Sequence, residues 1–374
     1  MNILDFGAKR GEFCGDAIQR AIDAAAVQGG GRVVVPAGEY ETASLVLRSN
    51  VELHLEAGAV LRFTDDFDAY PVVNIRWEGY EQPCRRPLIY AKNEVNVALT
   101  GFGTLEGQGK KWWTAFRAKT LDAARPCAVC FEDCTRVRMS DFMVHNSPNW
   151  TIHPVRCENV TIDKLTIVNP FDSPNTDGID PESCRNVRIT GCHIDVGDDC
   201  IAVKAGTEDA LENVPCENIA ITGCTMVHGH GGVVLGSEMT GCIRRVSITG
   251  CVFDGTDRGI RIKSRRGRGG AVEDVSVTGI VMNDVLCPLV INLMYFCGKD
   301  GKLPVVSDPN AQPVTERTPH VRRIRMADIV VTNAKSAAAC LYGLPEAPLE
   351  DISIVNTQIH LTEDAPSFPV MDRQ

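Results

Sequence analysis

A short phrase of alternating apolar residues recurs through most of the chain and limits the possible folds more than any other feature. Five copies begin with a cysteine, at residues 134–140, 157–163, 184–190, 216–222 and 242–249. Similar copies without the cysteine lie at 93–99, 272–278, 321–326 and 349–354. Alternation with a period of two, bounded by Gly, Asn or Asp, predicts short strands joined by tight turns.

The spacing of these copies indicates how the strands are arranged. The five copies with a cysteine begin about 23 to 32 residues apart, and no helical periodicity lies between them. A repeat of that length is typical of a parallel β-helix, in which each repeat forms one coil. We therefore predict an all-β protein that folds as a right-handed parallel β-helix.

One solenoid domain is predicted for residues 1–374, with a cap region at 1–30 and coils with projecting loops at 31–374. A solenoid needs a cover because its terminal coil would otherwise expose strand edges and core. Residues 16–27 predict a capping helix. Ile18 and Ile22 fall on one helical face, and Asp16 with Gln19 fits a capping box.

Charge and composition exclude several classes of partner. The net charge of −10 opposes attraction to nucleic acid or anionic lipid. Neither a signal peptide nor a membrane-spanning stretch is visible, so we expect a cytoplasmic protein, or a secreted one if a signal peptide has been removed. The oligomeric state is left open.

Sixteen cysteines are present, which in a chain of this length favours reduced, buried thiols over a disulfide framework. The cysteines lack the two clustered pairs of a structural zinc site, so no metal is predicted. Cys192, Cys224 and Cys251 each follow a glycine after a strand, and we expect them to stack as an internal ladder.

Polar residues crowd into four turns, at 175–180, 197–201, 229–232 and 258–263. Asp198 lies fourteen residues after the start of its repeat, and His230 lies fourteen after the start of the next. These two side chains are therefore predicted to stack one coil apart.

Neighbouring coils can supply the same patch. Asp177 and Asp199 are predicted to join it, together with Arg261 and Lys263, which strand alternation directs outward while Ile262 points inward. Such a patch suits glycosidic hydrolysis, which needs one carboxylic acid to protonate the leaving oxygen and one carboxylate to activate water or attack the sugar. Repulsion among three aspartates keeps at least one protonated.

The four phrases, in this order, resemble the signature of the polygalacturonase family, glycoside hydrolase family 28. The resemblance extends from the Asp5 to Ala8 phrase through the 30–40 segment to the last repeats. It implies a pectin-lyase-like solenoid and cleavage of α-1,4-galacturonosyl bonds in pectin without a metal or cofactor. It also implies inversion of anomeric configuration, consistent with carboxylates roughly 6.5 to 9.5 Å apart.

The resemblance also implies residue roles. Asp198 is the general acid, Asp177 and Asp199 position and deprotonate the attacking water, and His230 tunes the acid. The predicted substrate-binding residues are Asn175, Lys204, Gly231, Arg261 and Lys263. Of these, Arg261 and Lys263 bind the carboxylate of the galacturonate in the subsite before the cleaved bond. The glycines on either side of His230 let the sugar approach the backbone closely.

Several phrases look closest to bacterial exo-acting members, for example 147–154, Lys204 and 236–241. An exo enzyme needs a wall beyond the terminal sugar. The stretches 64–87, 106–126 and 298–320 are predicted to be projecting loops, and the first two could build that wall with Trp77, Trp112 and Trp113. The basic loop with Arg265, Arg266 and Arg268 could extend the uronate-binding surface or be solvated.

Three alternatives stay open: a rhamnogalacturonan-type hydrolase using the same site, a pectate or rhamnogalacturonan lyase on the same fold, and a glycan-binding protein without catalysis. Lyases typically use calcium and a basic Arg or Lys, so the acid and imidazole cluster favours hydrolysis. The predicted partner is a galacturonide oligosaccharide or polysaccharide.

Overall fold

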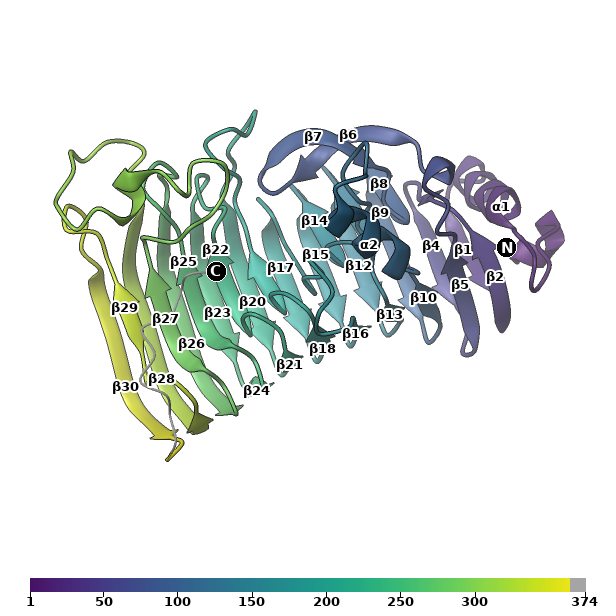
Figure 1. The fold of residues 1–374 in the computed structure, drawn as a ribbon. Coiled ribbons are helices and arrows are strands. Elements are labelled where there is room, and N and C mark those ends of the chain that lie inside the picture. The colour runs from purple at the N-terminus through teal and green to yellow at the C-terminus, as the bar shows by residue number, and fades with distance from the viewer. Residues whose placement is uncertain (364–374) are drawn as a thin grey trace.

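Parallel strands wind around one apolar core in the computed structural model, which describes residues 1–363 (Figure 1). The first of three faces carries the recurring phrases and consists of β1 (Gly31–Val35), β4 (Val51–Leu55), β9 (Val95–Gly101), β12 (Thr135–Ser140), β15 (Glu158–Asp163), β17 (Arg185–Thr190), β20 (Cys216–Thr222), β23 (Ile243–Thr249), β26 (Ala271–Asn283), β28 (His320–Ala334) and β30 (Glu350–Leu361).

The second face consists of β2 (Gly38–Thr42), β5 (Ala59–Phe63), β10 (Thr104–Glu106), β13 (Met143–His145), β16 (Thr166–Val168), β18 (His193–Val196), β21 (Thr225–His228) and β24 (Val252–Asp254), and β26, β28 and β30 continue onto it. The third consists of β3 (Leu45–Val46), β8 (Ile89–Lys92), β11 (Val129–Glu132), β14 (Ile152–Val155), β19 (Ile201–Val203), β22 (Val233–Gly236), β25 (Arg258–Lys263), β27 (Cys287–Asn292) and β29 (Cys340–Tyr342). The predicted right-handed parallel β-helix is confirmed. Its last eleven predicted residues, 364–374, lie outside the described residues.

Each recurring phrase is one strand of the first face, in the register that the sequence predicts. The apolar position aligns through Val137, Val160, Val187, Ile219 and Val246, each almost fully buried. Burial of these side chains on successive coils supplies a continuous hydrophobic core.

The predicted cysteine ladder is also present. Cys192, Cys224 and Cys251 are buried, and the backbone links their coils, because Thr225 donates to the carbonyl of Cys192 at 2.9 Å and Val252 to that of Cys224 at 3.0 Å. Among all sixteen cysteines only Cys242 and Cys297 are not fully buried.

Helix α1 (Gly15–Val27) covers the first coil, as predicted, and Ile18 and Ile22 are fully buried beneath it. The predicted capping box is wrong, because the helix begins one residue earlier, after Cys14, and no side chain caps it. The Gln19 amide instead bonds the Val46 backbone in both directions, at 2.9 Å each.

The three predicted loops are more ordered than expected. Residues 64–87 contain η2 (Phe67–Ala69) and an antiparallel hairpin of β6 (Val72–Trp77) and β7 (Tyr80–Arg85). Helix α2 (Lys110–Ala118) lies in the second stretch and η3 (Pro304–Ser307) in the third, while η1 (Ile3–Phe6) precedes α1. In Figure 1 the hairpin leaves the early coils and reaches over later ones.

Between residues 1 and 363, the helices are too short or too polar to cross a bilayer.

Candidate active site

The outer side of the third face gathers the predicted catalytic residues, because its coils are in register. Isolated bridges join Ile152 to Ile179 and Ile179 to Ile201, and β19 then pairs with β22. Ile179, Ile201 and Val233 are thus aligned on successive coils. The residues two positions before them are Asp177, Asp199 and Gly231, which therefore lie side by side. Asp198 is brought to the same place by the turn that leads into β19.

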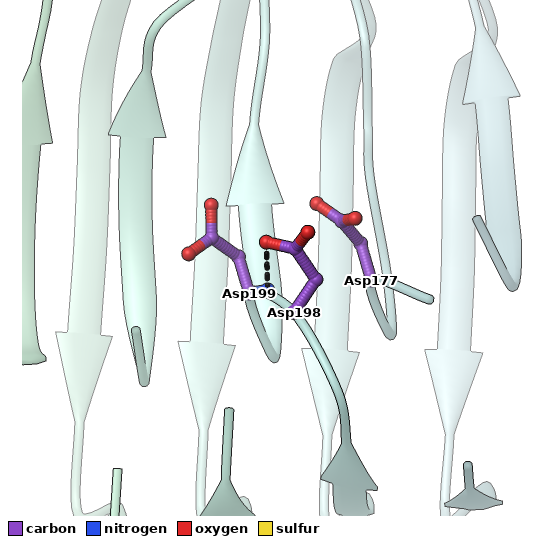
Figure 2. Close-up of side chains that lie close together, drawn as sticks. All are labelled: Asp177, Asp198 and Asp199. Atoms are coloured by element: carbon purple, nitrogen blue, oxygen red, sulfur yellow. Dashed lines mark hydrogen bonds between the residues drawn. The ribbon is translucent and has the colours of Figure 1, made fainter. Parts of the chain in front are cut away.

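Asp177, Asp198 and Asp199 each offer one carboxylate oxygen within 4.8 Å of the other two. Figure 2 shows Asp198 between the other two, with its carboxylate accepting a hydrogen bond from the Asp199 amide at 3.0 Å. Coils of a β-helix stack about 4.8 Å apart, which brings Asp177 close to Asp199, while Asp198 directly precedes Asp199 in the chain. The expected separation of 6.5 to 9.5 Å is therefore wrong as a description of the nearest carboxylate oxygens.

The predicted stacking of Asp198 and His230 is confirmed. The His230 backbone donates to the Asp198 carbonyl at 3.0 Å, and His230 Nδ1 lies 3.1 Å from Asp198 Oδ1. This hydrogen bond, with help from the Asp198 charge, raises the pKa of His230. The imidazolium form is thereby favoured next to the predicted acid.

Asp199 is a buried carboxylate that stays ionised. Burial opposes its charge, but Lys263 Nζ lies 2.7 Å from its Oδ2, and Arg261 Nη1 lies 3.8 Å from its Oδ1. These cations hold the pKa of Asp199 well below its usual range. Arg261 and Lys263 do point to the outer face as predicted, yet both are nearly buried and pair with Asp199.

Asp177 has the opposite electrostatic state. Burial, followed by the repulsion of Asp198 and Asp180, raises its pKa well above the usual range. Asp177 is therefore favoured in its protonated form, in line with the prediction that at least one aspartate of the cluster keeps a proton. A carboxyl group that keeps its proton is a poorer general base, so Asp177 is less able to deprotonate the attacking water.

Asp180 is a site residue that the sequence analysis did not assign. It is fully buried, its pKa is raised by burial, and its Oδ1 lies 3.7 Å from Lys204 Nζ. Its position three residues after Asp177 was a signal, but a third aspartate in a turn is also ordinary turn chemistry.

Lys204 lies at the centre of several carboxylates. Its Nζ is 3.9 Å from Asp177, 3.4 Å from Glu238 and 4.4 Å from the centre of the Trp150 ring. Burial disfavours the ammonium, but these carboxylates outweigh it and raise the pKa of Lys204. Burial opposes the charge of Glu238, but Lys204, followed by Arg268, lowers the pKa of Glu238 to about 2. Lys204 thus neutralises the cluster as well as facing the predicted substrate.

Asn175 and Gly231 occupy the edge of the cluster. Asn175 Oδ1 accepts a hydrogen bond from Arg125 at 2.7 Å. Its side chain lines a cavity of about 650 Å³, which we call the main cavity. Gly231 has no room for a side chain, because a Cβ there would lie 2.4 Å from Val234 and 3.2 Å from Asp199 Oδ1. The structure thus requires glycine at 231 for packing against the carboxylate.

The cluster opens into two neighbouring cavities. The larger one, about 650 Å³, is lined by Asp177, Asp198, Asp199 and Lys204 and extends to the turn of the β6–β7 hairpin. The smaller one, about 200 Å³, contains His230 and Arg261. Asp198, Lys263 and Tyr295 line both, so the predicted acid lies where a bound chain would pass from one to the other.

The tryptophans expected in a substrate wall pack elsewhere. Trp77 lies beneath the hairpin against Trp150, and Trp112 is fully buried against Phe67. Trp113 donates to the Ser147 carbonyl at 3.0 Å and lines a different cavity, beside α2. Of the two stretches expected to build the wall, only 64–87 reaches the main cavity.

The basic loop is not solvated. Arg265 and Arg268 both pair with Glu208, while Arg266 bonds Glu346 and three backbone carbonyls. All three guanidinium-bearing residues are buried, and only Arg268 lines the main cavity. The loop therefore supplies one cation to the candidate site and otherwise stabilises the fold.

Comparison with known proteins decides the family. Residues 31–360 match the family described as Glycosyl hydrolases family 28. This chain belongs to that family. As a family 28 member it is a glycoside hydrolase, and the predicted resemblance is confirmed.

Individual relatives fit the assignment. A probable polygalacturonase from Vitis vinifera is 36% identical over 91% of this chain and 69% of its own length. An endo-polygalacturonase of Pectobacterium carotovorum is 30% identical, covering 78% of this chain and 73% of that protein. The crystal structure of a hyperthermoactive exopolygalacturonase from Thermotoga maritima has a TM-score of 0.81 and 32% identity, covering 97% of this chain and 87% of that one.

Proposed function

We propose that this family 28 hydrolase removes terminal galacturonate units from pectin-derived oligogalacturonides by cleaving α-1,4-galacturonosyl bonds. The family assignment makes it a polygalacturonase-type hydrolase of pectin. The observation that supports exo action is the β6–β7 hairpin turn. Glu78 and Tyr80 of this turn line the main cavity together with the three aspartates.

The charges of the cluster suggest how its residues divide the chemistry. Asp198, between the two cavities and bonded to His230, would protonate the leaving oxygen. Asp199 is ionised and can accept a proton from the attacking water. Asp177 holds its proton more tightly, so it would donate a hydrogen bond to that water rather than deprotonate it.

Inversion of configuration is part of the proposal. By the usual rule, a separation of about 5 to 5.5 Å accompanies retention and a larger one inversion. The nearest oxygens here lie within 4.8 Å of one another, because Asp198 and Asp199 are consecutive residues and Asp177 lies on the preceding coil. An inverting water would therefore sit against the open side of the three carboxylates rather than between two distant ones. Proton NMR of the first product formed decides: α-linked substrate gives β-product on inversion.

Product analysis over time on polygalacturonate and trigalacturonate tests the proposed activity. Monogalacturonate should accumulate from the start, and Asp198→Asn should lose about 10²- to 10⁴-fold in kcat. Asp195→Asn is the matched control. Asp195 also pairs with a histidine, His228 at 2.9 Å, but lines neither cavity of the candidate site.

Other outcomes point to the alternatives. Mixed oligomers from the start would contradict exo action, and cleavage of rhamnose-containing substrates alone would indicate a rhamnogalacturonan hydrolase. An ultraviolet-absorbing unsaturated product, lost with chelator, would indicate a lyase. Binding without turnover of any uronide would leave only a glycan-binding role.

A further inference from the structure

The turn of the β6–β7 hairpin is fixed against the floor of the main cavity. Glu78 and Gly79 both have positive φ, 52° and 84°. Thr207 donates its backbone N–H to the Gly79 carbonyl at 3.0 Å. A Cβ at Gly79 would lie 2.4 Å from Thr207 Cγ2 and 2.8 Å from Glu238 Cγ, so the turn approaches as closely as glycine permits.

A buried arginine anchors the hairpin from below. Arg76 is fully buried, and its guanidinium donates to Glu81 at 2.7 Å and to the Glu212 carbonyl at 2.7 Å. Glu81 also accepts the backbone N–H of Leu211 at 3.1 Å. These bonds join the hairpin to the segment around 205–213, so the turn holds one position relative to the aspartates.

Within this fixed turn, the Glu78 carboxylate has no bonding partner among the described residues. Across residues 1–363 it has no hydrogen bond and no ion pair, although it is surrounded by charged groups, among them Glu238, Lys204 and Arg268. It remains exposed to solvent within the cavity that it lines. A rigidly placed acceptor without a protein partner is available to a ligand.

We propose that Glu78 is a specificity-determining residue that accepts hydrogen bonds from the free C4 hydroxyl, and its C3 neighbour, of the terminal galacturonate at the non-reducing end. This inference rests on the proposed exo activity and names the group that selects the chain end. An interior sugar lacks the free C4 hydroxyl because that oxygen is glycosylated.

The non-reducing end fits this acceptor better than the reducing end does. The C3 and C4 hydroxyls hold a fixed orientation on the ring, and two such donors suit one carboxylate. The anomeric hydroxyl of a reducing end interconverts between two configurations, so a fixed acceptor would match only part of the population.

The test compares oligogalacturonides of equal length that end in an ordinary galacturonate or in a 4,5-unsaturated one, which lacks the C4 hydroxyl. Wild-type protein should prefer the ordinary substrate by about 10- to 100-fold in kcat/KM, because the unsaturated end lacks one of the two hydrogen bonds to Glu78. In Glu78→Ala this preference should fall several-fold, chiefly through the ordinary substrate. Any penalty from the flatter unsaturated ring is common to both proteins and cancels.

Asn74→Ala is the control, because Asn74 is exposed on the same hairpin and does not line the cavity. It should keep the wild-type preference. Glu78→Gln, which retains an acceptor oxygen, should keep part of it.

An unchanged preference in Glu78→Ala would overturn the assignment of Glu78. The assignment of the chain end would be overturned by a different result with wild-type protein. Its kcat/KM would then be unaffected by unsaturation of the non-reducing end but changed by chemical reduction of the reducing end. The product pattern of wild-type protein on polygalacturonate tests exo action separately. Failure of that proposal and failure of this one are thus distinguishable.

Discussion

The charge state of Asp199 depends on two cations, Arg261 and Lys263, which lie two residues apart in the sequence on the next coil but one. Lys263 and Arg261 approach it from β25, and together they keep a buried carboxylate ionised. Without them, burial would favour the protonated acid. The two cations therefore act on the chemistry through Asp199 even before any substrate carboxylate arrives.

Replacing Lys263 by Met should raise the pKa of Asp199, because it removes one of the cations that stabilise the buried carboxylate. A base must be ionised, so activity should fail at a higher pH than in wild type as the pH is lowered. The acid limb of kcat against pH, at saturating substrate, measures this shift. Lys263→Arg keeps the charge and should leave the limb near its wild-type position. If the acid limb of kcat lies at the same pH in Lys263→Met and Lys263→Arg, this explanation is contradicted.

The sequence was informative about single residues where register alone places them. Equal spacing from the repeat start was enough to stack Asp198 on His230. Equal spacing did not predict hydrogen-bond partners that long-range packing brings together. Arg266 binds Glu346, eighty positions away, through contacts no local pattern encodes. Asp180 was not assigned for a different reason, since a third aspartate in a turn is also ordinary turn chemistry.

At the scale of elements, the β6–β7 hairpin is the part that departs most from the solenoid. Its sequence was interpreted as a loop because it is rich in Pro, Gly, aromatic and charged residues. Its strands nonetheless pair in register from Val72 with Arg85 to Trp77 with Tyr80. The hairpin gains its position from contacts with later coils, which local patterning cannot reveal.

Gly79→Ala should displace the hairpin turn, because the added methyl would overlap Thr207 and Glu238. The expected result is lower kcat/KM and a larger share of products longer than one sugar, since the displaced turn would no longer limit the main cavity. Timed product profiles by chromatography measure both effects.

Gly223→Ala is the matched control for this variant. Gly223 also has positive φ, 62°, so alanine costs about 1 kcal/mol there as well. Nothing lies within 4 Å of the added Cβ. Identical product profiles for both variants would mean that the turn does not determine chain-end selectivity.

At the scale of the whole molecule, the solenoid separates stability from catalysis. Each coil contacts mainly its neighbours, so a perturbation at one end weakens the array without reshaping a distant coil. Helix α1 packs on β1, β3 and β4, far along the chain from β19 and β22 (Figure 1). Loss of core at the cap is thus expected to lower stability and to leave the site geometry intact.

Ile22→Ala tests this separation directly. Ile22 is fully buried beneath α1, so truncation should cost about 2 to 5 kcal/mol in the free energy of unfolding. Val27, at the end of the same helix, is 88% exposed, and Val27→Ala should have almost no effect. Denaturant unfolding measures both. At a temperature where the Ile22 variant remains folded, its kcat/KM should equal that of wild type. A parallel fall of kcat/KM and stability would mean that the end coils transmit structure to the aspartates after all.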